Sequence, residues 1–421
     1  MKKIFIPLLT VVVVVGIVFA GCVPAVTPPV TPPVTPPVTP PVTPPVEPPV
    51  EPPVTPPSPE NPLKGLGIKP DGTPYTFAHV PCYLLNDWAV GANGCLGNVI
   101  KKADAEFLVC DPNLDLEMQI WMIEDLTIKG VDGIFTLPID SAALAPAVDK
   151  AWAAGIPTMN CAMRIYTDNL CCVAMHDSVE MGRVCGTWLV NYAERTNTHL
   201  YIYEIWHFVG MECHLLRHQG YREILDGHPL VTMVGESPDT YSLDEKAMEF
   251  TVEFLPTHPE VNTIITTGTL SGGVIEGLRV IGRLYPVGDP EHVIFTTTDE
   301  DPLTMRGIRN GHIDMIAGQS PWEDADLAAK AMLTYVVLGK PVPKEILIPV
   351  WPVDITTVDA TRYGADAIWG NKELTNFDLW PILDFSEEGI IARGEGLLLL
   401  DGVLGGFETP TVAMRKELLG Y

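Results

Sequence analysis

The residues with the clearest potential for metal chemistry are His214 and His218, which stand four positions apart. In a helix this spacing places both imidazoles on one face, where they could hold a divalent cation. A hydrolytic zinc site of the His-Glu-x-x-His kind also needs a general-base Glu between the histidines and a third ligand. Neither is present at a suitable spacing. The sequence therefore favours no metal site, and a metal-dependent hydrolase is the weakest of the functions considered.

Nucleotide and nucleic-acid binding are both disfavoured. The glycine-rich stretch Gly268–Gly273 lacks the Gly-Lys-Ser/Thr ending of a phosphate-binding loop. The net charge of −27 argues against nucleic acid, because phosphate contacts need clustered Lys and Arg.

Nine cysteines form the remaining reactive group, and eight of them lie beyond Cys22. An even number in an exported chain permits disulfides, whereas cysteines in apolar runs are commonly buried free thiols. The sequence leaves both states open. The eight are Cys82, Cys95, Cys110, Cys161, Cys171, Cys172, Cys185 and Cys213.

The elements that would position a binding site are clearest between Gly130 and Asn160. Gly133–Leu137 is a short apolar run, typical of a strand buried on both faces. Ala142–Ala154 has apolar residues at helical spacing and predicts a helix, after which the chain enters a further strand. In open α/β sheets, ligands bind beyond the carboxyl ends of the strands. The residues after Leu137 and around Asn160 are therefore candidates for a site.

The same alternation of strand and helix continues along the chain, which predicts parallel sheets with helices on both faces. The expected strands are Tyr75–Cys82, Glu106–Asp111, Gly133–Leu137, Leu200–Ile205, Val231–Gly235, Thr263–Thr267 and Val293–Thr297. The expected helices are Val90–Lys102, Leu116–Lys129, Ala142–Ala154, Glu212–Leu225, Leu243–Leu255, Gly272–Ile281 and Asp324–Leu338.

Three segments carry a family resemblance: GVDGI…AGIP from Gly130 to Pro157, RHQGYREILDGHP from Arg217, and KAMEFTVEFLPTHPEVNTII from Lys246. They resemble the sugar-binding branch of the type I periplasmic binding proteins, the receptors of ABC importers, over roughly Tyr75–Asp354. The resemblance implies two Rossmann-like α/β lobes with parallel sheets, joined by a three-segment hinge that suits closure around a ligand.

The resemblance also implies lobe boundaries. The first lobe is expected at residues 74–175 and 320–348, and the second at 176–319 and 349–358. Residues 359–421 form a C-terminal extension that runs past the resemblance, and its role stays open.

Three polar residues match the family's ligand-binding positions: Arg217, Asp299 and Gln319. The fork of donors on Arg217 can hold two hydroxyl or ring oxygens. The carboxylate of Asp299 can accept paired hydroxyls, because it offers only acceptors.

The first lobe is expected to add Asn86, Trp88 and Asn160. An indole face packs well on the apolar C–H face of a sugar, while an amide supplies both donor and acceptor. Leu137 stands where the family often has Asn or Asp, so the expected site is less acidic and less amide-rich than that of a standard pentose receptor. The cluster expected to face the cleft or solvent around Arg217 is His207, Met211, Cys213, His214 and His218.

Residues 1–21 are typical of a lipoprotein signal peptide, with a charged start and an apolar run too short to span a membrane. Phe19-Ala-Gly-Cys22 is similar to a lipobox and predicts a lipid anchor on Cys22. The linker, residues 22–62, contains TPPV five times and EPPV twice. Half of the positions in this repeat are proline, which favours extended polyproline II, about 3.1 Å per residue, as a spacer.

The sequence therefore predicts an exported, lipid-anchored, extracytoplasmic or periplasmic monomer that binds a small ligand, with a sugar favoured. It would deliver this ligand to the membrane subunits of an ABC permease. We expect no enzymatic activity, no cofactor and no nucleic-acid partner. The alternative keeps the fold and makes the chain a sensor receptor for a signal molecule or nucleoside.

Overall fold

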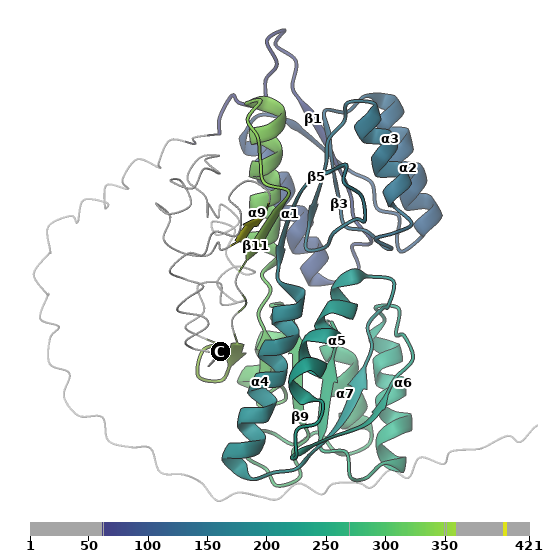
Figure 1. Ribbon diagram of the computed structural model, residues 1–421, viewed down its shortest axis with the longest axis vertical. Helices are drawn as coiled ribbons and strands as arrows, with labels where there is room; N and C mark the ends of the chain where they lie inside the picture. The colour runs from purple at the N-terminus through teal and green to yellow at the C-terminus, as the bar shows by residue number, and fades with distance from the viewer. Residues whose placement is uncertain are drawn as a thin grey trace, which may run out of the picture. The chain divides into compact units, whose positions relative to one another are not determined.

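The computed structural model describes residues 61, 63–268, 270–348, 350, 352–358 and 399–401. They form two α/β lobes, each built on one mostly parallel sheet flanked by helices (Figure 1). The predicted fold class is confirmed. Within the described ranges, no helix has the length and apolar character needed to span a bilayer. The predicted signal peptide, Cys22 and the Pro-rich linker lie outside the described residues.

The first lobe contains a seven-stranded sheet in the order β13-β11-β5-β4-β3-β1-β2. Neighbouring strands are parallel, except that β13 runs antiparallel to β11. The first strand of the chain, β1, lies inside this sheet, with β2 on one side and β3 on the other. The strand order therefore reverses direction at β1. The strands are β1 (Thr76–Val80), β2 (Glu106–Val109), β3 (Gly133–Thr136), β4 (Thr158–Cys161), β5 (Leu170–His176), β11 (Glu345–Ile348) and β13 (Leu399–Asp401).

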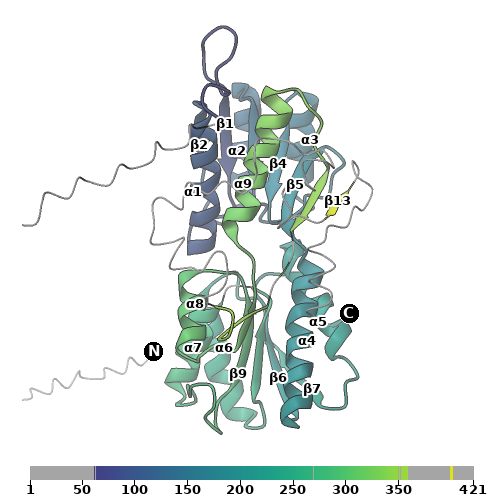
Figure 2. The same cartoon turned by 90° about the vertical axis from the view of Figure 1, so that its left-hand side faces the viewer.

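Helices cover both faces of this sheet. On one face α1 (Asp87–Lys102) packs beside α9 (Pro321–Met332), and a π-helical turn continues α9 (Figure 2). On the other face α2 (Leu116–Lys129) packs beside α3 (Ala145–Ala153). The predicted bounds of α2 are confirmed.

The ends of α2 follow from local chemistry. The side chain of Asp115 accepts a hydrogen bond from the backbone N–H of Met118 at 2.9 Å and caps the first turn. Gly130 ends the helix with a left-handed φ of 69°, a conformation that glycine adopts without steric cost.

The second lobe contains a six-stranded sheet in the order β12-β10-β9-β8-β6-β7, in which only β12 is antiparallel to its neighbour. Its strands are β6 (Leu200–Ile205), β7 (Val231–Glu236), β8 (Thr263–Thr266), β9 (Ile294–Thr298), β10 (Met315–Ala317) and β12 (Pro352–Asp354). Its helices are α4 (Ser178–Thr196), α5 (Glu212–Leu225), α6 (Asp244–Phe254), α7 (Ser271–Val280) and α8 (Pro302–Arg309).

Helices α4 and α5 approach each other very closely, and two glycines allow it. A Cβ added to Gly182 would lie 2.1 Å from the carbonyl oxygen of Arg217, and one added to Gly220 would lie 2.0 Å from that of Val179. Any side chain at either position would push the helices apart. This contact therefore fixes the part of α5 that carries Arg217.

The chain passes between the two sheets at three hinge segments, as the sequence predicts. It leaves the first sheet after β5, returns between β10 and α9, and leaves again between β11 and β12. The strand β13 of the C-terminal extension then adds to the edge of the first-lobe sheet. Sequence reasoning left the position of this extension open.

Candidate ligand-binding site

A pocket lies between the carboxyl ends of the strands of the two lobes. Five of the six predicted ligand-binding residues line it: Asn86, Trp88, Arg217, Asp299 and Gln319. The first lobe also contributes Cys82, Tyr83, Leu137, Ala162 and Met163, and the second contributes His207, Met211, Cys213 and His214.

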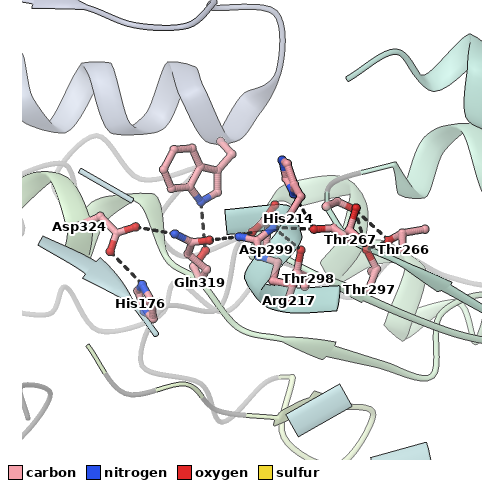
Figure 3. Close-up of polar contacts among 12 residues, drawn as sticks. His176, His214, Arg217, Thr266, Thr267, Thr297, Thr298, Asp299, Gln319 and Asp324 are labelled. Carbon is pink, nitrogen blue, oxygen red and sulfur yellow. Dashed lines mark hydrogen bonds and ion pairs between the residues drawn. The ribbon is translucent and has the colours of Figure 1, made fainter. Parts of the chain in front are cut away.

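Arg217 is the centre of the pocket's polar contacts (Figure 3). Its Nη1 donates to Thr267 O and Thr298 Oγ1, both at 3.0 Å, and its Nη2 donates to Asp299 Oδ1 at 3.2 Å and to Gln319 Oε1. The side chain is 4% exposed, so its charge is paired inside the protein rather than in water. Its Nε–H is buried and has no partner among the described residues.

The backbone of the pocket contains two residues in the left-handed region. Asp299 has φ 71° and Ala162 has φ 70°, and both line the pocket. For residues other than glycine this region is sparsely populated, and such residues cluster at ligand-binding sites. The chain therefore holds unfavourable backbone conformations on both walls of the same pocket.

Gln319 links the pocket to a buried charge cluster at the hinge (Figure 3). Its Nε2 donates to Asp324 Oδ2 at 2.8 Å, and the other oxygen of Asp324 contacts His176 Nδ1 at 2.9 Å. The second ring nitrogen of His176 lies 3.1 Å from Glu323 Oε2. Burial alone would lower the pKa of His176, but the carboxylates of Asp324 and Glu323 raise it to about 10. His176 is therefore an imidazolium at neutral pH.

Trp88 and Asn86 have structural contacts as well as places in the pocket wall. The indole Nε1 of Trp88 donates to Gln319 O at 3.2 Å, which joins the first lobe to the hinge. The side-chain oxygen of Asn86 accepts from Ala89 N at 2.8 Å and caps α1, and its amide donates to Tyr83 Oη at 3.0 Å.

Asn160 differs from its predicted position. It is fully buried in β4, and its amide donates to Met163 O at 3.1 Å. Asn160 therefore supports the backbone behind the wall, while Ala162 and Met163 reach the pocket in its place.

The histidines around Arg217 separate into two groups. His207 and His214 line the pocket with their rings 4.2 Å apart, and His214 Nδ1 donates to Thr267 O at 2.7 Å. Burial lowers the pKa of His207 to about 3 and that of His214 well below its usual value, so both rings are neutral. His218 instead contacts Glu204 at 2.7 Å. Within the part of the chain that the structure describes, no cluster of three or more His, Cys, Asp or Glu side chains could hold a metal ion.

The two cysteines of the pocket, Cys82 and Cys213, are protonated thiols. Burial raises the pKa of Cys213 to about 12 and that of Cys82 further still. All eight cysteines of the described ranges are free, and seven of them are buried. The sequence left both disulfides and free thiols open, and the structure has free thiols at these eight positions.

The comparisons with known proteins agree with this geometry. Residues 77–341 match the model of the periplasmic binding protein domain. The chain belongs to the periplasmic binding protein family.

Individual relatives of this periplasmic binding protein are distant. The ribose import binding protein of Bacillus subtilis is 22% identical over 250 residues, which cover 59% of this chain and 77% of that protein. A crystal structure of a galactofuranose binding protein has a TM-score of 0.63 at 18% identity and covers 68% of this chain and 97% of that one. A Bacillus halodurans ABC transporter solute binding protein with bound myo-inositol has a TM-score of 0.61 at 18% identity, with 69% and 97% covered. At these identities the structural likeness shows the fold alone.

Sequence reasoning missed several lining residues. Tyr83 had a signal, because an aromatic residue directly follows the first strand, three positions before Asn86. Cys82, Ala162 and Met163 had none, because their types are equally common in a core. Only the path of the backbone after β1 and β4 determines whether these apolar side chains line the pocket or lie in the hydrophobic core.

Proposed function

We propose that this periplasmic binding protein is an extracytoplasmic solute-binding lipoprotein that captures an uncharged sugar in the pocket and delivers it to an ABC permease. The observation that carries the proposal is the Arg217, Asp299 and Gln319 constellation, placed where the strands of two α/β lobes end. Relatives support it, since their names give ribose and galactofuranose as what they bind.

The charge balance of the pocket favours a neutral ligand. Arg217 is its cation and is paired with Asp299 at 3.2 Å, while His207 and His214 are uncharged. A phosphate or carboxylate would have to displace Asp299 or lie beside it. A neutral hydroxyl or ring oxygen, in contrast, adds no charge beside this pair.

Contacts between the lobes support capture by closure. Trp88 of the first lobe donates to the backbone of Gln319, and Arg164 of the first lobe lies near Glu212 of the second, with 3.8 Å between Nη1 and Oε1. Met211 and Cys213 belong to the same buried apolar cluster as first-lobe residues. A ligand held by both walls would stabilise this arrangement, because it gains its full contacts only there.

Binding without chemistry fits the same residues. The side chains that touch the pocket pair with one another rather than forming a nucleophile and base, and the thiols are protonated. The lipobox at Cys22 supports the proposed lipid anchor, and membership of the periplasmic binding protein family supports the proposed permease partner. A lipid on Cys22 followed by a polyproline spacer would hold the two lobes away from the membrane surface.

The test is thermal unfolding of the purified full-length chain against sugars, polyols, nucleosides and furanose signal molecules. A ligand at 100 times its dissociation constant adds about 2.7 kcal/mol to the free energy of unfolding. We expect a sugar to raise the melting temperature and Arg217→Met to abolish the shift. A response to nucleosides and to no sugar would favour the receptor for a signal molecule or nucleoside, and would reject the sugar proposal.

A further inference from the structure

We propose that Asp324 and His176 are positioning residues for the pocket: His176 keeps Asp324 charged, and this charge fixes which end of the Gln319 amide faces Arg217. Neither Asp324 nor His176 lines the pocket itself. The inference deepens the proposed function, because it concerns how the same pocket is held in its binding form. It rests on that function only where ligand binding is measured.

Hydrogen-bonding chemistry allows one orientation of the Gln319 amide. Its Nε2 donates to Asp324 Oδ2 at 2.8 Å, and its Oε1 accepts from Arg217 Nη2. An ionised carboxylate can only accept, and a guanidinium can only donate. Turning the amide over would place oxygen against oxygen at Asp324 and N–H against N–H at Arg217. All three residues are at most 3% exposed, so water cannot relieve these contacts.

The charge on Asp324 is what makes this orientation strict. A protonated Asp324 would carry an O–H that could donate to Gln319 Oε1, and the amide could then turn over. Burial raises the pKa of Asp324 and so favours protonation, while the His176 imidazolium is the strongest influence against it. His176 Nδ1 lies 2.9 Å from Asp324 Oδ1. His176 is therefore the cation that keeps this carboxylate ionised.

Other ionisable groups belong to the same cluster: Glu323 on α9, Glu300 and Asp299 after β9, and Arg217 on α5. Glu323 takes the second ring nitrogen of His176, at 3.1 Å. Burial and the charge of Glu323 raise the pKa of Glu300 to about 8, so Glu300 is uncharged at neutral pH. Arg217 pairs with Asp299 at 3.2 Å and reaches Asp324 only through Gln319.

This chain of hydrogen bonds joins two hinge segments to the second lobe. His176 ends β5, where the chain first leaves the first-lobe sheet. Gln319 and Asp324 lie where it returns, just before and within the first turns of α9. Arg217 belongs to α5 of the second lobe. The hinge therefore holds a pocket side chain in place from outside the pocket.

Exchanging the acid and the amide tests the orientation without a ligand. Gln319→Glu sets two carboxylates against each other, and Asp324→Asn removes the charge that fixes the amide. The double variant Gln319→Glu/Asp324→Asn restores an acceptor facing Arg217 and a donor between the two positions. In urea unfolding of the full-length protein, its unfolding equilibrium constant should be about 2 to 150 times lower than the two single effects predict together. Additive effects would overturn the proposal.

The part played by His176 can also be measured without a ligand. In a His176→Gln background Asp324 should be protonated and should tolerate a second carboxyl group beside it. We therefore expect Gln319→Glu to raise the unfolding equilibrium constant less in this background than in the wild type, although His176 and Gln319 do not bond each other. An equal effect in both backgrounds would reject the role of His176.

The pH dependence of binding connects the chain to the pocket. With D-ribose and D-galactose as probes in isothermal titration calorimetry, affinity should fall as the pH is lowered through the pKa of Asp324. Removing a neighbouring cation raises the pKa of an aspartate by about 1–3 units. In His176→Gln we therefore expect the fall at a pH about 1–3 units higher, whereas a merely structural role would weaken binding without moving this midpoint.

His292→Gln is the matched control for the pH profile. His292 is also buried and contacts a carboxylate, that of Asp314, at 2.8 Å, but it lies before β9, at the end of the sheet opposite the pocket. Its variant should keep the wild-type midpoint. An unmoved midpoint in His176→Gln would reject the proposal and leave the proposed function standing. Non-additive unfolding with no binding of either sugar would support the positioning chain and count against the proposed function.

Discussion

The buried ion pair between Arg217 and Asp299 predicts a large loss of stability when one partner is removed. Arg217→Met keeps the length of the side chain but removes the cation and its four hydrogen bonds. Asp299 is 6% exposed, so its carboxylate would stay buried after losing the Arg217 cation. Removing one partner of a buried pair costs about 3–5 kcal/mol. We expect the free energy of unfolding of the ligand-free protein to fall by that amount.

The double variant Arg217→Met/Asp299→Asn separates charge from packing. The introduced asparagine would keep the shape of the aspartate side chain without its charge, so the buried charge that destabilises the single variant is gone. We expect the double variant to be more stable than Arg217→Met by about 1–3 kcal/mol, the range of coupling energies between contacting residues.

Urea unfolding of the ligand-free protein measures these free energies, with Arg183→Met as the matched control. Arg183 pairs with Glu223 at 2.8 Å, but both side chains are 39% exposed, and exposed pairs contribute at most about 1 kcal/mol. A cost below about 1 kcal/mol for Arg217→Met would refute the reasoning. So would a double variant no more stable than the single one.

Three further predictions concern other parts of the chain. Gly220→Ala should lower the free energy of unfolding by at least about 1–3 kcal/mol, because the new Cβ would lie 2.0 Å from Val179 O; Gly94→Ala in α1, with nothing within 4 Å, is the control and should not destabilise. His176 has its pKa raised to about 10, so its stabilising contribution is complete below about pH 6.5 and is lost as the pH rises through 10. Urea unfolding at pH 7 and 10 should show a larger loss for wild type than for His176→Gln, and equal losses would contradict the assignment. Cys22→Ser should abolish incorporation of labelled fatty acid and release the protein from membranes; retained label would place the anchor elsewhere.

Periodicity predicts much of the fold, because a buried parallel strand and an amphipathic helix have distinct patterns. The bounds of α2 and α5 agree with the prediction to the residue, and those of β6 do as well. These elements have clear endings, such as Gly130 after α2. The expectation of parallel α/β sheets needed only the alternation of such segments, whereas the division into two lobes came from the family resemblance.

Several elements were missed, and for two of them, β5 and α8, the reason is identifiable. β5 contains two adjacent cysteines and a histidine, so its pattern is not distinctive, although all seven of its residues are buried. α8 has only eight residues. Its capping box, in which Asp301 and Thr304 bond each other's backbone, was a readable signal for the start of a helix.

The residues of the site were likewise predicted only in part. The polar residues Arg217, Asp299 and Gln319 were identified from motif resemblance, and the structure brings them within hydrogen-bond distance. The additional role of Asn86 as a helix cap follows from its place one residue before α1, a helix that sequence reasoning began three residues too late. The inward position of Met163 depends on a left-handed turn at Ala162, and no residue type announces that turn.

The strand β13 changes where the protein can be shortened. The family match ends at residue 341, yet β11, β12 and β13 all follow it. Val358 lies in the core of the second lobe while β13 pairs with β11 in the first, so the forty residues 359–398 tie the lobes together a fourth time. Fully extended they could reach about 130–140 Å, so their length alone sets no limit on how far the lobes separate. A chain ended at Val358 would lose this tether and leave β11 as a bare sheet edge, open to pairing with another molecule.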